Sequence, residues 1–328
     1  MAWPLLGISL VLLAVVLFMP EYNGCKRWLV LPGVGTLQPS EIAKFAVVLV
    51  FSHIISLNHD RMCSFAVGVL PFALVLGVVA ALMLLEPHLS GTLLILGIGA
   101  VLMFVGGTGL RWFVLAGVGG AAAIGAAVVV MPDLVPYAAD RLRSWQDPFA
   151  DPLGDGHQTI QSLYAIGSGG ATGLGLGNSI EKQLWLPEST NDFIFSVVCE
   201  ELGFVGAVIV IVLFVLFLVQ GFWIAFHAEN RFCTLVGIGI MAQIAWQVFC
   251  NIAVVTNTLP NTGISLPFFS SGGTSLILLL AEMGVMVNIG RNGERARLER
   301  EEAHAERERQ RKAKTIVLDT ARRAQTEQ

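Results

Sequence analysis

Charged residues are scarce in this chain. Lys, Arg, Asp and Glu make up 13% of its 328 residues, whereas 55% are apolar. A typical soluble domain carries about 25% charged residues, and the mean hydropathy of +0.71 is far above that of a soluble domain of this length. The scarcity of charge therefore excludes a soluble enzyme and indicates a protein that crosses a membrane several times.

Cysteine is also rare, and the five cysteines are scattered without the spacing of a disulfide framework or a zinc site. We expect them to serve as small apolar residues, and we predict no metal site. The glycine cluster GSGGATGLGLG lacks the Lys-Ser/Thr of a phosphate-binding loop, so close backbone packing is the better interpretation. No basic patch accompanies exposed aromatic residues, so nucleic-acid binding has no support.

Long apolar runs occupy most of the chain. A helix needs about 20 residues to cross the hydrocarbon core of a bilayer, and an open strand there would leave backbone groups unpaired. The first run lacks the basic start and the cleavage site of a signal peptide, so we interpret it as a spanning helix. The sequence thus predicts an all-α, polytopic membrane helical bundle with about eight transmembrane helices, near residues 2–20, 40–57, 65–85, 89–106, 111–132, 192–220, 232–255 and 273–290.

Basic residues set the expected orientation, because cytoplasmic segments of membrane proteins are enriched in Lys and Arg. Eleven of the 20 basic residues follow residue 290, which predicts a membrane domain over 1–290 and a charged cytoplasmic tail over 291–328. The tail suits a solvated helix or a disordered extension, and a partner-docking or lipid-surface role is left open. Eight spans place the loop 133–191 outside, and its turn signals and the helical spacing over 158–166 predict that it is folded.

Carboxylates near apolar runs need a physical reason to be there. Asp192 precedes a predicted helix, where it suits either an N-cap or a chemical role. Glu200 and Glu201 follow about two turns later, and at least one should face a cavity or a basic partner; packing is the better interpretation for Glu201. Glu41 and Lys44 lie on one face of another helix, where they can form an ion pair or line a substrate path.

Five motifs, in this order, resemble those of the SEDS family (shape, elongation, division and sporulation), of the FtsW/RodA/SpoVE type. They cover nearly the whole predicted membrane domain. Family members typically have ten spans, so two amino-terminal helices are absent by this comparison, and His88 stands where the family usually has Asp. The motifs are NGCKRWLVLPGVGTLQPSEIAKF, LLEPHLSGT, DPLGDGHQTIQSLYAIGSGGATGLGLGNS, LPESTNDFIFSVVCEELG and LPNTGISLPFFSSGGTS.

The resemblance implies a peptidoglycan glycosyltransferase of division or sporulation, which polymerises lipid II, an undecaprenyl-pyrophosphate-linked substrate, into glycan strands. It implies a bacterial cytoplasmic membrane protein with an extracytoplasmic active site, in which Asp192 is the general base that takes a proton from the attacking sugar hydroxyl. The implied partners are a class B penicillin-binding transpeptidase and other proteins of the division or elongation complex. No cofactor is implied, although a divalent cation bridging the pyrophosphate is left open.

A pyrophosphate leaving group makes cationic side chains candidates for substrate binding, because they offset its growing negative charge. Lys26, Arg27 and Lys182 are such candidates, and they equally suit anchors at lipid headgroups. Trp28 suits either the substrate cleft or an interfacial aromatic belt. The remaining candidates for substrate binding are Glu41, Lys44, Glu200, Ser270 and Ser271.

Two other functions remain open from the sequence. A lipid II flippase or transporter would need charged residues such as Glu41, Lys44 and Glu200 to line a continuous route across the membrane. A non-catalytic scaffold that recruits a transpeptidase would keep its function when Asp192 is replaced. The glycosyltransferase alone requires that carboxylate for chemistry.

Overall fold

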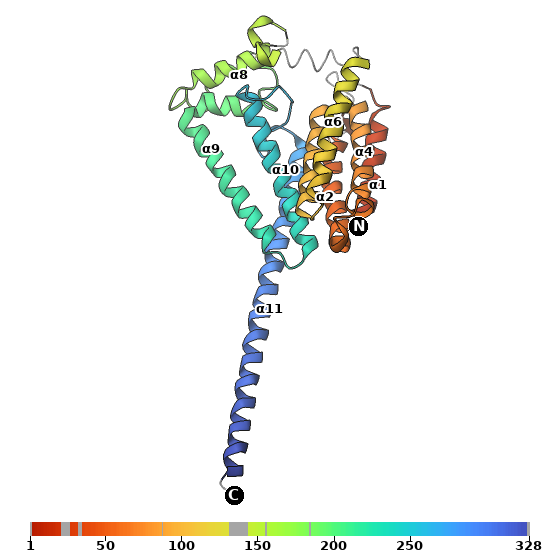
Figure 1. The fold of residues 1–328 in the computed structure, drawn as a ribbon. Coiled ribbons are helices and arrows are strands. Elements are labelled where there is room, and N and C mark those ends of the chain that lie inside the picture. The colour runs from red at the N-terminus through yellow and green to blue at the C-terminus, as the bar shows by residue number, and fades with distance from the viewer. Residues whose placement is uncertain are drawn as a thin grey trace.

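The computed structural model describes residues 2–20, 27–31, 35–86, 88–130, 144–154, 156–183 and 185–326. Helices dominate these residues, so the predicted all-α membrane bundle is confirmed (Figure 1). Each of the eight predicted spans forms a helix. The helices are α1 (Ala2–Val16), α2 (Pro39–Asn58), α4 (Leu70–Leu85), α5 (Leu89–Val105), α6 (Leu110–Val130), α9 (Ile194–Phe226), α10 (Arg231–Val255) and α11 (Gly273–Thr326).

Helix length separates the spans into two groups. Within the described residues, five segments are long and apolar enough to cross a membrane: Pro39–Arg61, Phe65–Leu85, Ile194–Phe226, Arg231–Val255 and Gly273–Glu308. The segments Ala2–Val16, Leu89–Val105 and Leu110–Gly120 are apolar helices of shorter length. The turn η1 (His59–Arg61) and the short helix α3 (Phe65–Gly68) connect α2 to α4.

The centre of the bundle is formed by α10, which packs against α2, α5 and α9. Of the apolar window of α10, 72% is buried, compared with 17% for α9. The chain thus holds α10 on several sides, whereas α9 runs obliquely beside it with most of its surface turned outward (Figure 1). Among the long helices, α10 is thus the most enclosed by the rest of the chain.

A small hairpin precedes α2. Strands β1 (Leu29–Leu31) and β2 (Gly35–Leu37) pair in antiparallel fashion, with Leu29 opposite Leu37. The hydroxyl of Thr274, at the start of α11, donates to the carbonyl of Thr36 (2.9 Å). The sequence did not predict this hairpin, because strands of three residues are too short to show an alternating pattern.

The predicted folded loop contains the turn η3 (Pro148–Ala150) and α8 (His157–Ser168), which packs on α9. The predicted helical spacing over residues 158–166 is therefore confirmed. These elements lie at the same end of the bundle as the first turns of α9 (Figure 1).

The glycine cluster packs against a break in α9. Gly203 has a left-handed backbone (φ 68°), which interrupts the helix. The N–H of Leu174 donates to the carbonyl of Glu200, and the N–H of Phe204 donates to the carbonyl of Gly170. The cluster thus supplies partners to backbone groups that the break releases, a requirement near a bilayer. The predicted use of these glycines for close backbone packing is confirmed.

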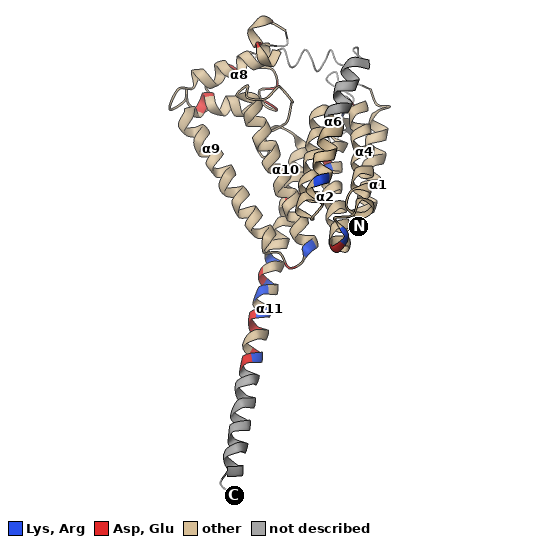
Figure 2. Ribbon diagram, viewed as in Figure 1, with Lys and Arg blue, Asp and Glu red and all other residues tan. Residues whose placement is uncertain are grey.

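The helix α11 continues unbroken past residue 290 and leaves the bundle at the end opposite α8 (Figure 1). Figure 2 shows acidic and basic residues interleaved along its projecting part. Arg297 and Glu301 form an ion pair there (2.8 Å). Of the two structures considered for the tail, the helix is therefore the one observed.

Candidate functional site

A cavity of about 450 Å³ lies between α2, the hairpin, the turn from α4 to α5, the loop before α9 and the loop before α11. These segments are distant in the sequence, yet they bring together most of the predicted site residues. Lys26 lies outside the described residues. The predicted residues that line the cavity are Arg27, Trp28, Glu41, Lys44, Asp192, Ser270 and Ser271.

Asp192 is half-buried in the cavity wall, immediately before α9. The N-cap residue of α9 is Phe193, so the interpretation of Asp192 as an N-cap is wrong. Its main-chain carbonyl accepts a hydrogen bond from the amide of Asn251 (2.7 Å). Its carboxylate, in contrast, has no hydrogen-bond partner among the described residues. The carboxylate is therefore available to a ligand in the cavity.

The protonation of Asp192 is set by its surroundings. Burial raises the pKa of Asp192 to about 6, the negative charge of Glu188 raises it as well, and the positive charge of Arg27 opposes this rise. A carboxylate with this pKa is still ionised at neutral pH, and it binds a proton more tightly than an ordinary aspartate. Both properties suit a general base.

Ser270 and Ser271 join the loop before α11 to the loop before α9. The hydroxyl of Ser270 donates to the carbonyl of Asn191 (2.7 Å) and accepts from the N–H of Leu266 (2.8 Å). The N–H of Ser271 donates to the carbonyl of Thr190 (2.9 Å). The two serines thus shape the cavity wall, in addition to lining it.

The predicted ion pair between Glu41 and Lys44 is confirmed, with 2.7 Å between Oε1 and Nζ. Both side chains are largely buried, with 13% and 3% of their surface exposed. Both residues also line the cavity. The pair therefore stabilises the start of α2 and places a charged group at the cavity, so the two interpretations of these residues are compatible.

Arg27 and His88 lie near the turn between α4 and α5. The Nε of Arg27 donates to the carbonyl of Glu86 (3.3 Å). Burial, together with the positive charges of Arg27 and Lys44, lowers the pKa of His88 to about 3, so its imidazole is neutral. The positive charges in this part of the cavity therefore come from Arg27 and Lys44, and His88 adds none.

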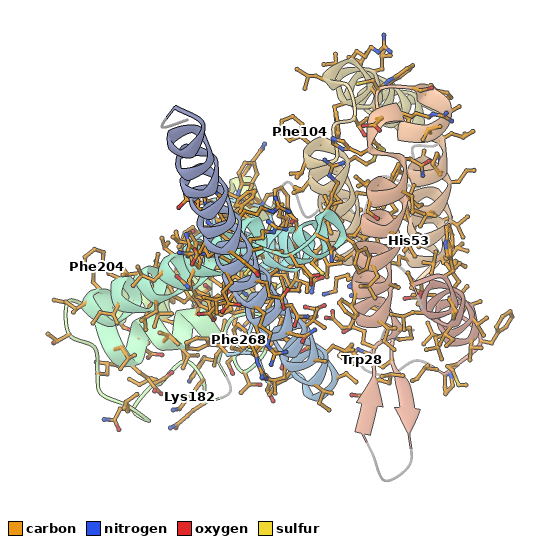
Figure 3. The ribbon with its side chains drawn as sticks, turned by 90° about the horizontal axis from the view of Figure 1, so that it is seen from below. Trp28, His53, Phe104, Lys182, Phe204 and Phe268 are labelled. Atoms are coloured by element: carbon orange, nitrogen blue, oxygen red, sulfur yellow. The ribbon has the colours of Figure 1, made fainter. Side chains whose placement is uncertain are left out.

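Two predicted site residues, Lys182 and Glu200, are not part of the cavity lining. The Nζ of Lys182 pairs with Oε1 of Glu201 (2.5 Å), and Figure 3 shows Lys182 well apart from Trp28. Glu200 is fully buried, and its carboxylate accepts the hydroxyl of Ser179 (2.5 Å). Of the two neighbouring glutamates, Glu201 is thus the one with a basic partner. Neither Lys182 nor Glu200 is placed to contact a ligand in the cavity.

Sequence reasoning missed a stripe of amide side chains on α10. Asn251 holds the carbonyl of Asp192, Gln247 lines the cavity, and the Nε2 of Gln243 donates to the buried carboxylate of Glu282 on α11 (3.2 Å). The signal was present, because three amides spaced four residues apart share one face of a helix. Their partners lie in other segments, which the spacing does not identify.

The cavity combines one unpaired carboxylate with cationic groups and hydroxyls. Such a set can accept a proton from a hydroxyl and stabilise an anionic leaving group. Over the part of the chain that the structure describes, no cluster of three or more His, Cys, Asp or Glu side chains is suited to hold a metal ion. Fold and site together define a polytopic membrane protein with a cavity lined by a carboxylate, cationic side chains and hydroxyls.

The chain belongs to the FtsW/RodA/SpoVE family of cell cycle proteins, whose model matches residues 1–295. It is 40% identical to stage V sporulation protein E of Bacillus subtilis (strain 168) over 274 residues, which are 82% of this chain and 72% of that protein. It is 36% identical to the probable peptidoglycan glycosyltransferase FtsW of Trichlorobacter lovleyi over 297 residues, 88% of this chain and 75% of that protein. The predicted family is therefore confirmed.

Solved structures share the fold. A chain from a peptidoglycan synthase complex, described as coordinating polymerization and crosslinking, matches with a TM-score of 0.73 and 36% identity, covering 89% of this chain and 81% of that one. The rod shape determining protein RodA of Thermus thermophilus matches with a TM-score of 0.63 and 30% identity, covering 89% and 78%. The helical membrane architecture is thus common to these proteins.

Proposed function

We propose that this protein is a peptidoglycan glycosyltransferase that polymerises lipid II into glycan strands, with Asp192 as general base. Its family and the names of its relatives support the reaction. The role of Asp192 is supported by its position in the cavity wall, which Arg27 and Lys44 also line. Its carboxylate is half-buried and has no hydrogen-bond partner in the described structure.

In the proposed reaction, a sugar hydroxyl of the acceptor attacks the anomeric carbon of the donor. The bond between that carbon and the lipid pyrophosphate breaks, the pyrophosphate leaves with the electron pair, and the hydroxyl proton passes to Asp192. A positioned base of this kind typically contributes about 10²–10⁴-fold to the rate. The carboxylate also stabilises the positive charge that develops at the anomeric carbon.

Arg27 and Lys44 are the proposed partners of the pyrophosphate, because charge-assisted hydrogen bonds stabilise the negative charge on the leaving group. Glu41 keeps the ammonium group of Lys44 oriented at the cavity through their ion pair. Trp28, at the base of the hairpin, is proposed to contact the substrate from the cavity rim. Lys26 stays a candidate for the pyrophosphate, whereas Lys182 and Glu200 are left out of the proposed site.

The proposed setting is the bacterial cytoplasmic membrane, with the cavity outside and the tail inside. The basic tail favours the cytoplasm, and the loops that form the cavity lie at the end of the bundle opposite the tail (Figure 1). A class B penicillin-binding transpeptidase is the proposed partner, in line with the related complex that couples polymerization to crosslinking. The mechanism needs no cofactor, and chelation by EDTA would test for a divalent cation bound with the pyrophosphate.

The test is polymerisation of lipid II by the purified protein with its transpeptidase, comparing wild type with Asp192→Ala. Long glycan strands from the wild type alone, with an unchanged melting temperature of the variant, are expected. Strands from both proteins would remove Asp192 from the base role. Strands from neither, together with movement of lipid II between the leaflets of vesicles, would favour a transporter instead.

A further inference from the structure

One amide side chain holds both loops that flank the carboxylate of Asp192. Asn251 lies in α10 with 1% of its surface exposed. Its Nδ2 donates to the carbonyl of Asp192 (2.7 Å) and to the carbonyl of Ile264 (2.7 Å). Both N–H groups of the amide are therefore in use, and both bonds are at the short end of the usual range.

These bonds matter because they act on the main chain of a residue whose carboxylate has no partner of its own in the described structure. Asp192 precedes α9 rather than lying within it, and its side chain has no hydrogen-bond partner in the described structure. Its position therefore depends on its main chain, which Asn251 ties to the most buried of the long helices.

The second bond places the opposite wall. Gly263 precedes Ile264, and a Cβ built on Gly263 would lie 3.1 Å from Oδ2 of Asp192. The loop held through Ile264 thus passes directly beside the carboxylate. One amide thus bonds to the main chain of Asp192 and to the loop that passes beside its carboxylate.

We propose that Asn251 is a positioning residue for the glycosyl transfer, acting through the main chain of Asp192 and Ile264. Asn251 is not among the residues that line the cavity, so it acts without touching the substrate. The inference rests on the proposed function of Asp192 as base. It assigns to α10 the task of holding that base within reach of the acceptor hydroxyl.

Replacing Asn251 by Ala removes both bonds and loosens the main chain at Asp192 and Ile264, while Ser270 and Ser271 still join the two loops. A misplacement of about 1 Å can cost about 10²-fold in rate, so we expect kcat to fall about 10- to 100-fold. KM should stay within about threefold, because Arg27 and Lys44 still bind the substrate. Asn251→Ser retains one donor, so an intermediate kcat is expected.

Ser162 offers a matched control. It is fully buried in α8, and its hydroxyl contacts Oγ of Ser196 (2.7 Å) and donates to the carbonyl of Val255 (2.7 Å), one turn beyond Asn251 on α10. Ser162→Ala thus also removes two buried hydrogen bonds next to α10. These bonds leave the main chain of Asp192 and the cavity lining untouched, so we expect a lower melting temperature with kcat retained.

The pH profile gives a readout that general loosening would not change. In Asn251→Ala the carboxylate gains contact with water, which lowers the pKa of Asp192 from about 6 toward that of an ordinary aspartate. The acid limb of the pH profile, where kcat falls as the base is protonated, then moves to lower pH. Glu188 and Arg27, the charged groups that act on Asp192, are unchanged in this variant. In Ser162→Ala the limb should stay in place.

The experiment measures kcat, KM, the acid limb and the melting temperature for wild type, Asp192→Ala, Asn251→Ala, Asn251→Ser and Ser162→Ala, each with the transpeptidase. Reduced kcat with a displaced acid limb in the Asn251 variants alone supports the inference. Wild-type kcat with an unmoved limb overturns it, as does an equal loss in Ser162→Ala. Should Asn251→Ala fail to fold, Asn251→Ser decides by the same criteria. An inactive wild type, or an active Asp192→Ala, would instead overturn the proposed function.

Discussion

Two carboxylates eight residues apart, Asp192 and Glu200, have opposite surroundings. Glu200 is fully buried, and it accepts hydrogen bonds from the hydroxyl of Ser179 and from the N–H groups of Ile180 (2.9 Å) and Glu181 (3.4 Å). Asp192 is half-buried beside a cavity, and its carboxylate has no such partner in the described structure. The same chemical group is satisfied by the fold at one position and is left available for the proposed chemistry at the other.

The difference shows why burial alone does not identify a catalytic group. A buried charge is tolerated when hydrogen bonds replace the water that it has lost, and Glu200 meets this condition. Its bonds attach the segment that follows the glycine cluster to α9. Asp192 lacks this compensation, which agrees with its proposed role as a base.

Apart from the loss of polymerisation expected for Asp192→Ala, the largest effect should come from Glu200→Ala. The hydroxyl of Ser179 and the N–H of Ile180 would lose their partner, which destabilises the fold by roughly 3 kcal/mol. Thermal unfolding in detergent would measure this loss. Polymerisation per folded molecule should be retained, and its disappearance in a stably folded variant would assign Glu200 to the mechanism.

The next effect is on the pH dependence of polymerisation. Because the pKa of Asp192 is raised to about 6, the base is protonated below that pH, and kcat/KM should fall about tenfold per pH unit. Activity is present above the pKa and is lost as pH falls through it. Glu188→Gln removes a negative neighbour, so its acid limb should lie at lower pH. A profile that is flat through pH 6 would contradict the assignment of the base.

A smaller effect is expected from Gly263→Ala, with Gly177→Ala as its control. Both glycines have left-handed backbones, with φ of 65° and 85°, so both variants should be destabilised by about 1–2 kcal/mol. A Cβ on Gly263 approaches Asp192, whereas a Cβ on Gly177 meets nothing within 4 Å. Only Gly263→Ala should therefore lower kcat, by about tenfold. Equal kcat values in the two variants would argue against a close fit around the carboxylate.

The smallest effect should come from Lys182→Ala. Lys182 pairs with Glu201 near the surface, where 32% of the lysine side chain is exposed. Such a pair contributes about 0–1 kcal/mol, so the melting temperature should change little and KM for lipid II should be unchanged. A clear rise in KM would return Lys182 to the list of substrate-binding residues.

Local features of the sequence predicted much of the fold. The apolar runs identified the helices, because backbone groups in a bilayer must be satisfied within the segment. The pairing of Glu41 with Lys44 followed from their spacing on one helix face. The packing role of the glycines followed from the absence of a phosphate-binding pattern.

Features that depend on distant segments could not be predicted in this way. The break at Gly203 lies within an apolar run that reads as a single helix, and the glycine cluster that supplies its partners lies about 30 residues earlier. The sequence does not distinguish Asn251 from the other polar residues of α10, because its two hydrogen-bond acceptors belong to distant loops. For the same reason, the sequence predicts Lys182 as a substrate-binding cation, because its partner Glu201 lies in another segment.

The apolar runs of this chain are sufficient to predict a bundle of membrane helices, and its motifs are sufficient to predict the family. These properties arise from local hydrophobicity and short patterns, which need no tertiary contact to be read. Whether Asp192 or Glu200 has hydrogen-bond partners for its carboxylate, in contrast, follows from contacts between distant segments. That distinction depends on hydrogen-bond partners from remote segments, present around Glu200 and lacking around the carboxylate of Asp192 in the described structure.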